Sequence, residues 1–257
     1  SNTVLQPKDQ LRVHVTEKKT SDQIVPVPMD LSVVFEDEHV LVIDKPAGMP
    51  VHPSQGHYEN TLANGIAWYY RNEATPFVFR AVNRLDRDTS GLVLLAKNPY
   101  SSCVLSDAVK DHTIHREYAA IVSGKTDASG TIDLPIARKD GSTIERVCDP
   151  ERGETAVTHY RTFAYNKDAD ISFIRLLLET GRTHQIRVHM KAIGHPLPGD
   201  FLYCPDYRFI DRQPLHSTYL RFSHPVTGEK LEFSASLPED MRKLFPDIKN
   251  PSGPVFF

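Results

Sequence analysis

Short apolar segments joined by turns constrain the fold of this chain more than any other feature of its sequence. Six segments have the length of a strand and are rich in β-branched residues or alternate between apolar and polar residues. They are 31–35, 39–43, 92–96, 118–122, 156–163 and 171–178. Hairpin turns are indicated at 140–141 and 224–228, and helical patterns are fewer, at 60–70 and 100–109. Parallel strands need long, usually helical, crossovers. The sequence therefore predicts an α+β fold in which flanking helices cover a mixed, largely antiparallel sheet.

Composition sets limits on the class of protein. With 257 residues, of which 40% are hydrophobic, the chain can bury a large core. It has no run of 18 apolar residues and no charged start followed by an apolar stretch, so we expect a cytoplasmic protein without a membrane span or a secretion signal. The cysteines, Cys103, Cys148 and Cys204, are widely spaced, so neither a disulfide framework nor a metal site is expected. Because the net charge is −3, any basic surface for a nucleic acid must be local.

The loop before the predicted strand at 92–96 is crowded with charge. It reads Asn83-Arg84-Leu85-Asp86-Arg87-Asp88-Thr89-Ser90-Gly91. Its last four residues alone would suit an ordinary turn. In an extended chain, however, Arg84 and Asp86 point to one side, and a carboxylate beside guanidinium groups stays ionised, as a nucleophile or a base must. A structural turn and a catalytic loop are both compatible with this pattern.

The stretch after the last of these strands has a helical pattern. Ile186, Met190 and Ile193 recur at helical spacing, although an alternation of apolar residues within the stretch would also suit a strand. Thr183 as an N-cap and Gly194 as the stop favour the helix. We therefore predict a helix that ends at about Ile193.

The same stretch is the most basic part of the chain, with Arg182, His184, Arg187 and Lys191. Such a run is most often a solvated face. Arg and His side chains near a helix N-terminus also suit the anionic backbone of a nucleic acid, because the helix dipole favours negative charge there. In either case the stretch supplies local positive charge.

Tyr118 lies at the start of a predicted strand, directly after His115-Arg116-Glu117. It could be an ordinary core residue. A tyrosine at the edge of a strand also offers a face on which a base can stack and a phenol oxygen that can donate or accept. The local pattern does not separate these uses.

Several motifs occur in a fixed order. They are Lys45-Pro46-Ala47-Gly48 with Val51-His52-Pro53, Arg84 to Gly91, Arg116-Glu117-Tyr118, Ala156 to Tyr160, Gly181 to His189, and His195-Pro196-Leu197 with Gly199-Asp200. Together they closely resemble the RluA/RluD-type family of RNA pseudouridine synthases, from about residue 31 to the C-terminus. The resemblance implies the pseudouridine synthase fold, an active-site cleft across the sheet and no cofactor. Many members have His where this chain has Asn83, so a hydrogen bond or an RNA contact at that position is expected to differ.

The resemblance also implies roles for individual residues. Asp86 is expected to be the catalytic aspartate, Tyr118 the tyrosine that stacks on the target base, and Arg182 the arginine that pairs with the aspartate. RNA contacts are expected from Arg84, Arg87, His184, Gln185, Ile186 and Arg187. Of these, Arg84 would enter the space that the flipped base leaves, and Ile186 would pack beneath the base.

The first 30 residues differ from the rest. They contain several prolines and one alternating stretch, 11–15, which cannot fold as an isolated strand. Family members often carry a small N-terminal RNA-binding domain, so we expect 1–30 to be the remnant of one plus a linker, and 31–257 to be the catalytic domain. The expected partner is structured RNA, either ribosomal RNA of the large subunit or, as the main alternative, transfer RNA. The chain is expected to act as a monomer.

Two other functions fit parts of the pattern. A non-catalytic RNA-binding module would need only the basic motif around Arg187. A nucleoside or glycoside hydrolase could use Asp86 and Asp88 as its pair of carboxylates. For a synthase, the sequence leaves open whether Asp86 attacks the substrate directly or abstracts a sugar proton to give a glycal.

Overall fold

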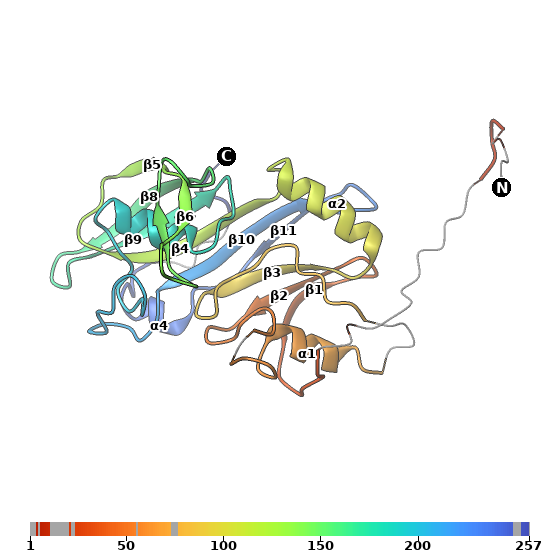
Figure 1. The fold of residues 1–257 in the computed structure, drawn as a ribbon, viewed down its shortest axis with the longest axis horizontal. Helices are drawn as coiled ribbons and strands as arrows, with labels where there is room; N and C mark the ends of the chain where they lie inside the picture. Colours follow the sequence, from red (N-terminus) through yellow and green to blue (C-terminus); the bar gives the residue numbers. More distant parts are fainter. Residues whose placement is uncertain are drawn as a thin grey trace.

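A computed structural model describes residues 4, 6–10, 21, 24–54, 56–72, 77–248 and 253–256. Nine strands in these residues form one sheet. They are β1 (Ser32–Glu36), β2 (Val40–Lys45), β3 (Ser90–Ala96), β4 (His115–Ser123), β5 (Ser129–Asp133), β8 (Val157–Asn166), β9 (Ile171–Leu178), β10 (Leu215–Ser223) and β11 (Lys230–Ser234). Their order is β1-β2-β3-β10-β4-β9-β8-β5, with β11 paired to β10 (Figure 1). Only β3 and β10 pair in parallel, so the sheet is mixed and largely antiparallel, as predicted.

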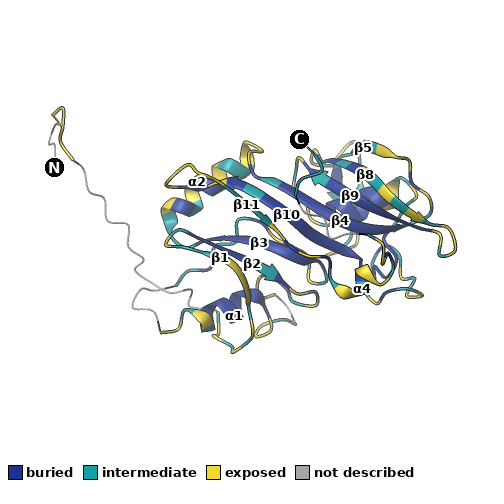
Figure 2. Cartoon of the chain, turned by 180° about the vertical axis from the view of Figure 1, so that it is seen from behind, coloured by how far each residue is buried: buried dark blue, intermediate teal, exposed yellow. Residues whose placement is uncertain are grey.

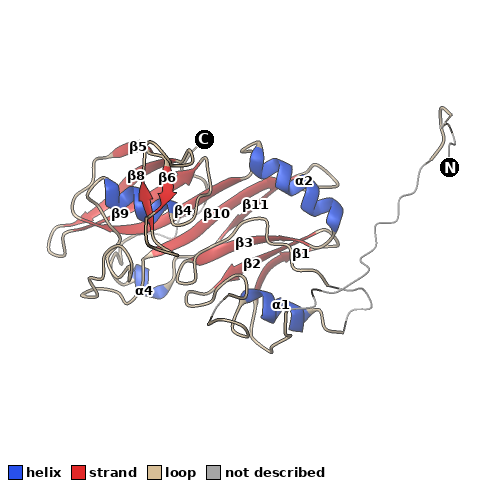
Figure 3. Cartoon of the chain, viewed as in Figure 1, coloured by secondary structure: helices blue, strands red, loops and turns tan. Residues whose placement is uncertain are grey.

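Helices lie around this sheet rather than between its strands (Figure 3). They are α1 (Leu62–Tyr69), α2 (Pro99–Lys110), α3 (Gln185–Ala192) and α4 (Glu239–Arg242), and a small separate hairpin is formed by β6 (Ile136–Arg138) and β7 (Arg146–Cys148). Thr61 and Asn98 cap α1 and α2 through their side chains. The predicted helices and strands of the globular part are therefore confirmed, whereas the strand predicted at 11–15 lies outside the described residues.

Alternate residues of β4 separate the two faces of the sheet. Tyr118 and Ala120 share a buried cluster with Leu62 of α1 and Met190 of α3. Ala119, on the other side of the strand, packs with residues around α4, and Leu105 of α2 packs on β2 and β3 from that same side. Since both faces are covered, the central strands are buried along most of their length (Figure 2). The face with α1 and α3 carries the cavity described below.

Gly91 allows β3 to lie against β10 directly after the charged loop. Its φ is +108°, and a Cβ atom there would lie 2.3 Å from the carbonyl oxygen of Ser217. We expect Gly91→Ala to lower the free energy of unfolding by about 3 kcal/mol, because backbone must move and the dihedral is unfavourable. Gly141→Ala is the matched control, since Gly141 also has a positive φ but no atom within 4 Å of an added Cβ. It should cost only about 1 kcal/mol in urea unfolding, and equal losses would contradict the close approach at Gly91.

Candidate functional site

A cavity of about 700 Å³ opens on the face of the sheet that carries α1 and α3. Its lining residues come from segments that are far apart in the sequence: 51–52, 81–86, 109–112, 116–118 and 178–183. An adjoining smaller pocket is lined by residues of the charged loop, of β4 and of 184–187. The predicted cleft is therefore present, and both charged motifs border it.

The charged loop is held from two sides. Asn83 is buried and donates to the carbonyl of Leu92 at 3.2 Å, while its side-chain oxygen accepts from the backbone N–H of Leu94 at 2.7 Å. The ammonium group of Lys45 donates to the carbonyl of Arg87 at 3.1 Å. Asn83 thus clamps the loop to β3, which gives this unusual residue a structural role. Between these anchors the Asp86 side chain faces the cavity.

Asp86 pairs with Arg187. The Nη1 atom of Arg187 donates to Oδ2 of Asp86 at 2.8 Å. The other edge of the same guanidinium forms a two-point pair with Asp200, with Nε to Oδ2 at 2.6 Å and Nη2 to Oδ1 at 2.8 Å. Burial lowers the pKa of Arg187, but the hydrogen bond to Asp200 and the charge of Asp86 more than offset this and raise it. The guanidinium is therefore a fixed positive group that holds the carboxylate of Asp86 at hydrogen-bond distance.

The pairing of Asp86 with Arg182, expected from the resemblance, is wrong. Arg182 lies in the turn before α3, where its Nη1 atom contacts Glu154 at 2.5 Å and its Nε donates to the carbonyl of Thr155 at 3.0 Å. Its side chain is 40% exposed at the rim of the cavity. Arg187 is one turn further, inside α3, and its exposure is only 2%. The helix therefore directs Arg187, and not Arg182, towards the carboxylate.

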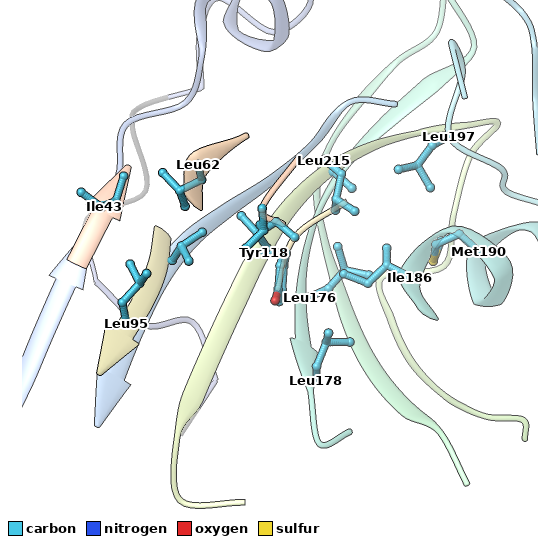
Figure 4. Close-up of a cluster of buried hydrophobic side chains, with 14 of the residues drawn as sticks. Ile43, Leu62, Leu95, Tyr118, Leu176, Leu178, Ile186, Met190, Leu197 and Leu215 are labelled. Atoms are coloured by element: carbon cyan, nitrogen blue, oxygen red, sulfur yellow. The ribbon is translucent and has the colours of Figure 1, made fainter. Parts of the chain in front are cut away.

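Tyr118 and Ile186 form an apolar part of the cavity beside Asp86. Both line the smaller pocket, together with Leu178 and Leu215. Figure 4 shows the ring of Tyr118 among these aliphatic side chains. Burial raises the pKa of Tyr118, and the negative charge of Asp86 adds to the rise, so its phenol stays protonated at neutral pH. This surface could pack on the flat face of a base.

His184 faces Asp86 from the start of α3. It occupies the N-cap position with φ 58° and makes no side-chain cap, so the cap predicted at Thr183 is wrong. Its Nδ1 atom lies 2.9 Å from the hydroxyl of Tyr203, and its Nε2 atom lies 3.9 Å from Oδ2 of Asp86. Burial lowers the pKa of His184, which favours the neutral imidazole. The RNA contact expected from His184 stays a prediction, to be made by a neutral imidazole.

The other side chains predicted to contact RNA differ in whether their polar groups are already paired within the protein. Arg84 is exposed and lines both pockets. Arg87 is exposed but forms an ion pair with Asp88 at 2.7 Å and lines neither pocket. The RNA contact expected from Gln185 is not supported. Gln185 is buried, and its amide group forms four internal hydrogen bonds, to Val157, Thr158, Thr180 and Arg182. Gln185 shapes the turn before α3 and has no group left for RNA.

Asp200 is the site residue whose role was not foreseen. It is completely buried, and besides Arg187 it accepts from the backbone N–H groups of Leu202 and Tyr203. Gly199, with φ +75°, provides the turn that brings it there. A signal was present in the sequence, because Gly199-Asp200 belongs to an ordered motif and a buried acid needs a basic partner. Spacing alone could not assign that partner to Arg187.

Lys45, which anchors the charged loop, should make stability depend on pH. It is fully buried, and burial lowers its pKa from 10.5 to about 7. Between these values the unfolded chain binds more protons than the folded one, so stability should rise with pH across the range by about 1.4 kcal/mol per unit at most. We expect this rise in chemical unfolding of the wild type between pH 7 and 9 and its absence in Lys45→Met. Parallel curves for the two proteins would contradict it.

Over the described ranges, none of the helices has the length and apolar content needed to cross a membrane. In the same ranges, no three side chains of His, Cys, Asp or Glu gather as they would around a metal ion.

Residues 39–192 match the family described as RNA pseudouridylate synthase. An uncharacterized RNA pseudouridine synthase of Bacillus subtilis, YjbO, is 45% identical over 94% of this chain and 84% of its own length. Ribosomal large subunit pseudouridine synthase D of Zymomonas mobilis is 42% identical over 86% of this chain and 73% of its own length. Human RNA pseudouridylate synthase domain containing 1 shares the fold, with a TM-score of 0.67 at 23% identity over 87% of this chain and 97% of that one.

Proposed function

We propose that this chain, which belongs to the RNA pseudouridylate synthase family, isomerises uridine within structured RNA. In this proposal Asp86 is the catalytic carboxylate. Membership makes the chain an isomerase that acts on RNA. The observation that carries the role of Asp86 is its position. Among the described residues, it is the carboxylate that lines both pockets, and it is held there by the buried guanidinium of Arg187.

The substrate uridine must leave its stack to reach Asp86. Turning a nucleotide out of a helix or loop costs a few kcal/mol, which stacking and edge contacts in the pocket offset. The apolar surface of Tyr118 and Ile186 supports a role as the two walls around the base. Arg84 is free at the entrance, which supports its predicted insertion into the space that the base leaves.

The reaction breaks the bond from uracil N1 to ribose C1′, turns the ring, and joins C5 to C1′. N1 gains a proton and C5 loses one, so the product is an isomer and no electrons are transferred overall. Asp86 either attacks the substrate as a nucleophile or removes a sugar proton to give a glycal. Both routes need the ionised carboxylate, and both need it pointing at the sugar. The hydrogen bond from Arg187 is made to Oδ2 and leaves Oδ1 of Asp86 available.

The hydrolase alternative lacks the second carboxylate predicted for it. Asp88 pairs with Arg87 through both of its oxygens and lines neither pocket. Glu179 also lines the larger cavity, but it pairs with His159 at 2.5 Å and does not line the smaller pocket beside Asp86. A mechanism that needs two facing acids is therefore not supported at this site.

We further propose that the substrate is ribosomal RNA of the large subunit. Support comes from relatives named for that activity in Zymomonas mobilis and Pseudomonas aeruginosa, at 42% and 37% identity. Transfer RNA is the alternative that the same experiment would identify. The target loop is expected to be recognised by its shape and by splayed bases.

One experiment tests both the activity and the target. Purified protein is incubated with total RNA from a strain that lacks it, and pseudouridine is mapped chemically. A new site in large-subunit ribosomal RNA supports the proposal, and a site in transfer RNA replaces the proposed substrate. RNA binding without any new site would indicate a binding module, and release of free uracil would indicate a hydrolase.

A further inference from the structure

Arg116 is a buried cation without a partner. Three arginines of the described residues are buried, and two of them, Arg175 and Arg187, donate to carboxylates. Arg116 is 7% exposed, yet its side chain makes no hydrogen bond or ion pair within the described ranges, and its Nε is among the buried atoms that lack a partner. A buried charge without a counter-charge is unfavourable, so a protein keeps one where something else supplies the anion.

The guanidinium of Arg116 lies at the wall of the 700 Å³ cavity. It is two residues before Tyr118 on β4, and the two side chains therefore point to the same face of the sheet, about 7 Å apart along the strand. That spacing places the positive charge next to the surface proposed for the base. A nucleotide whose base contacts Tyr118 would bring its own backbone phosphate into this region.

Gly181 makes room for this guanidinium. A Cβ atom at Gly181 would lie 3.3 Å from Nη1 and 3.6 Å from Nη2 of Arg116. The bare backbone at this position therefore leaves room for the Nη1 and Nη2 end of the guanidinium beside the turn before α3. Arg116 and Gly181 both line the cavity, whose charged lining is mainly basic: Arg84, Lys110, Arg116 and Arg182 against Asp86 and Glu179.

We propose that Arg116 binds one of the two phosphates that flank the target uridine. The inference rests on the proposed function, because it takes RNA as the ligand of the cavity. A guanidinium donates charge-assisted hydrogen bonds to phosphate oxygens, and no group of the described residues takes up those of the Arg116 side chain. The contact would fix the position of the ribose over Asp86 and supply the anion that Arg116 lacks.

Arg116→Met tests the proposal, because it keeps the length and apolar contacts of the side chain and removes the charge. With a stem-loop RNA that carries the mapped uridine, we expect about 10- to 100-fold weaker binding. The slope of log affinity against log salt concentration should fall by about 0.7, the value for one phosphate contact on a single strand. The melting temperature should stay equal or rise, because an unpaired buried charge has been removed.

Two variants calibrate these results. Lys243→Met removes a positive charge from an exposed position on the opposite face, and RNA binding should not change. Arg175→Met removes the buried cation that pairs with the buried Glu117, so it should lower the melting temperature, as the loss of a structural arginine does. A fall of the melting temperature in Arg116→Met like that of Arg175→Met would overturn the proposal, and so would an unchanged affinity and salt slope.

A modified RNA assigns the phosphate. A neutral methylphosphonate is placed at either side of the target uridine, and affinity is measured for the wild type and for Arg116→Met. At one of the two positions the wild type should lose about 10- to 100-fold and the variant nothing further. Equal losses in both proteins at both positions would refute the contact. If the protein binds RNA but no uridine is mapped, the proposed function fails, while the salt slope on a bound structured RNA still decides whether Arg116 contacts a phosphate.

Discussion

Asp86→Asn should abolish isomerisation, with turnover lowered by about 10⁴-fold or more, while RNA binding survives. The amide has the size of the carboxylate, and its oxygen can still accept the N–H of Arg187, so the pocket should keep its shape. What disappears is the negative charge that either attacks the substrate or removes the sugar proton. Single-turnover conversion of the mapped stem-loop RNA measures the chemistry, and fluorescence titration of the same RNA measures binding.

Asp88→Asn is the matched control for this variant. Asp88 lies two residues further in the same loop, but its carboxylate contacts Arg87 and not the cavity. Its replacement should leave turnover close to that of the wild type. Near-normal turnover in Asp86→Asn would remove Asp86 from the mechanism, whereas equal losses in both variants would mean that the loop had been disturbed.

The fold could be predicted because most of its information is local. The strand at 92–96 is apolar at every position, as β3 is buried at every position, and the helix at 60–70 has both a capping residue and a periodic apolar face. The order of the strands in the sheet could not be predicted from the sequence. β10 inserts between β3 and β4, and that placement depends on contacts such as the one between Gly91 and Ser217, which no local pattern reveals.

The position of the site could be predicted from the sequence, but the pairing of its charged side chains could not. Both charged motifs border one cavity, as expected from the sequence. The pairing of Arg182 with Asp86 comes from the resemblance, and no local pattern separates Arg182 from Arg187. Arg182 lies in the turn before α3, whereas Arg187 lies inside the helix, which directs its side chain to the carboxylate. Asp200, the second partner of Arg187, lies in another loop and could be found only in three dimensions.

Arg187→Lys should lower turnover by about 10²- to 10³-fold. An ammonium group keeps the positive charge but has no planar fork, so it cannot hold Asp200 at two points and donate to Asp86 at the same time. Asp86 would then lose its fixed direction, and the buried carboxylate of Asp200 would lose part of its pairing. We therefore also expect the free energy of unfolding to fall by about 2 kcal/mol. Single-turnover kinetics and urea unfolding measure the two effects.

Arg182→Lys tests whether the effect comes from the contacts of Arg187 with Asp86 and Asp200 or from any arginine at the cavity. Arg182 contacts the exposed Glu154, and a lysine can replace an exposed ion pair at little cost, so its effect on turnover should be far smaller than that of Arg187→Lys. Asp200→Asn provides the converse test, because Asp200 lines neither pocket and could act on the reaction only by orienting Arg187. It should slow the chemical step while RNA affinity stays the same. If Arg182→Lys were the more damaging change and Asp200→Asn left the rate intact, Asp86 would be oriented by the rim arginine, and the buried pair would serve stability alone.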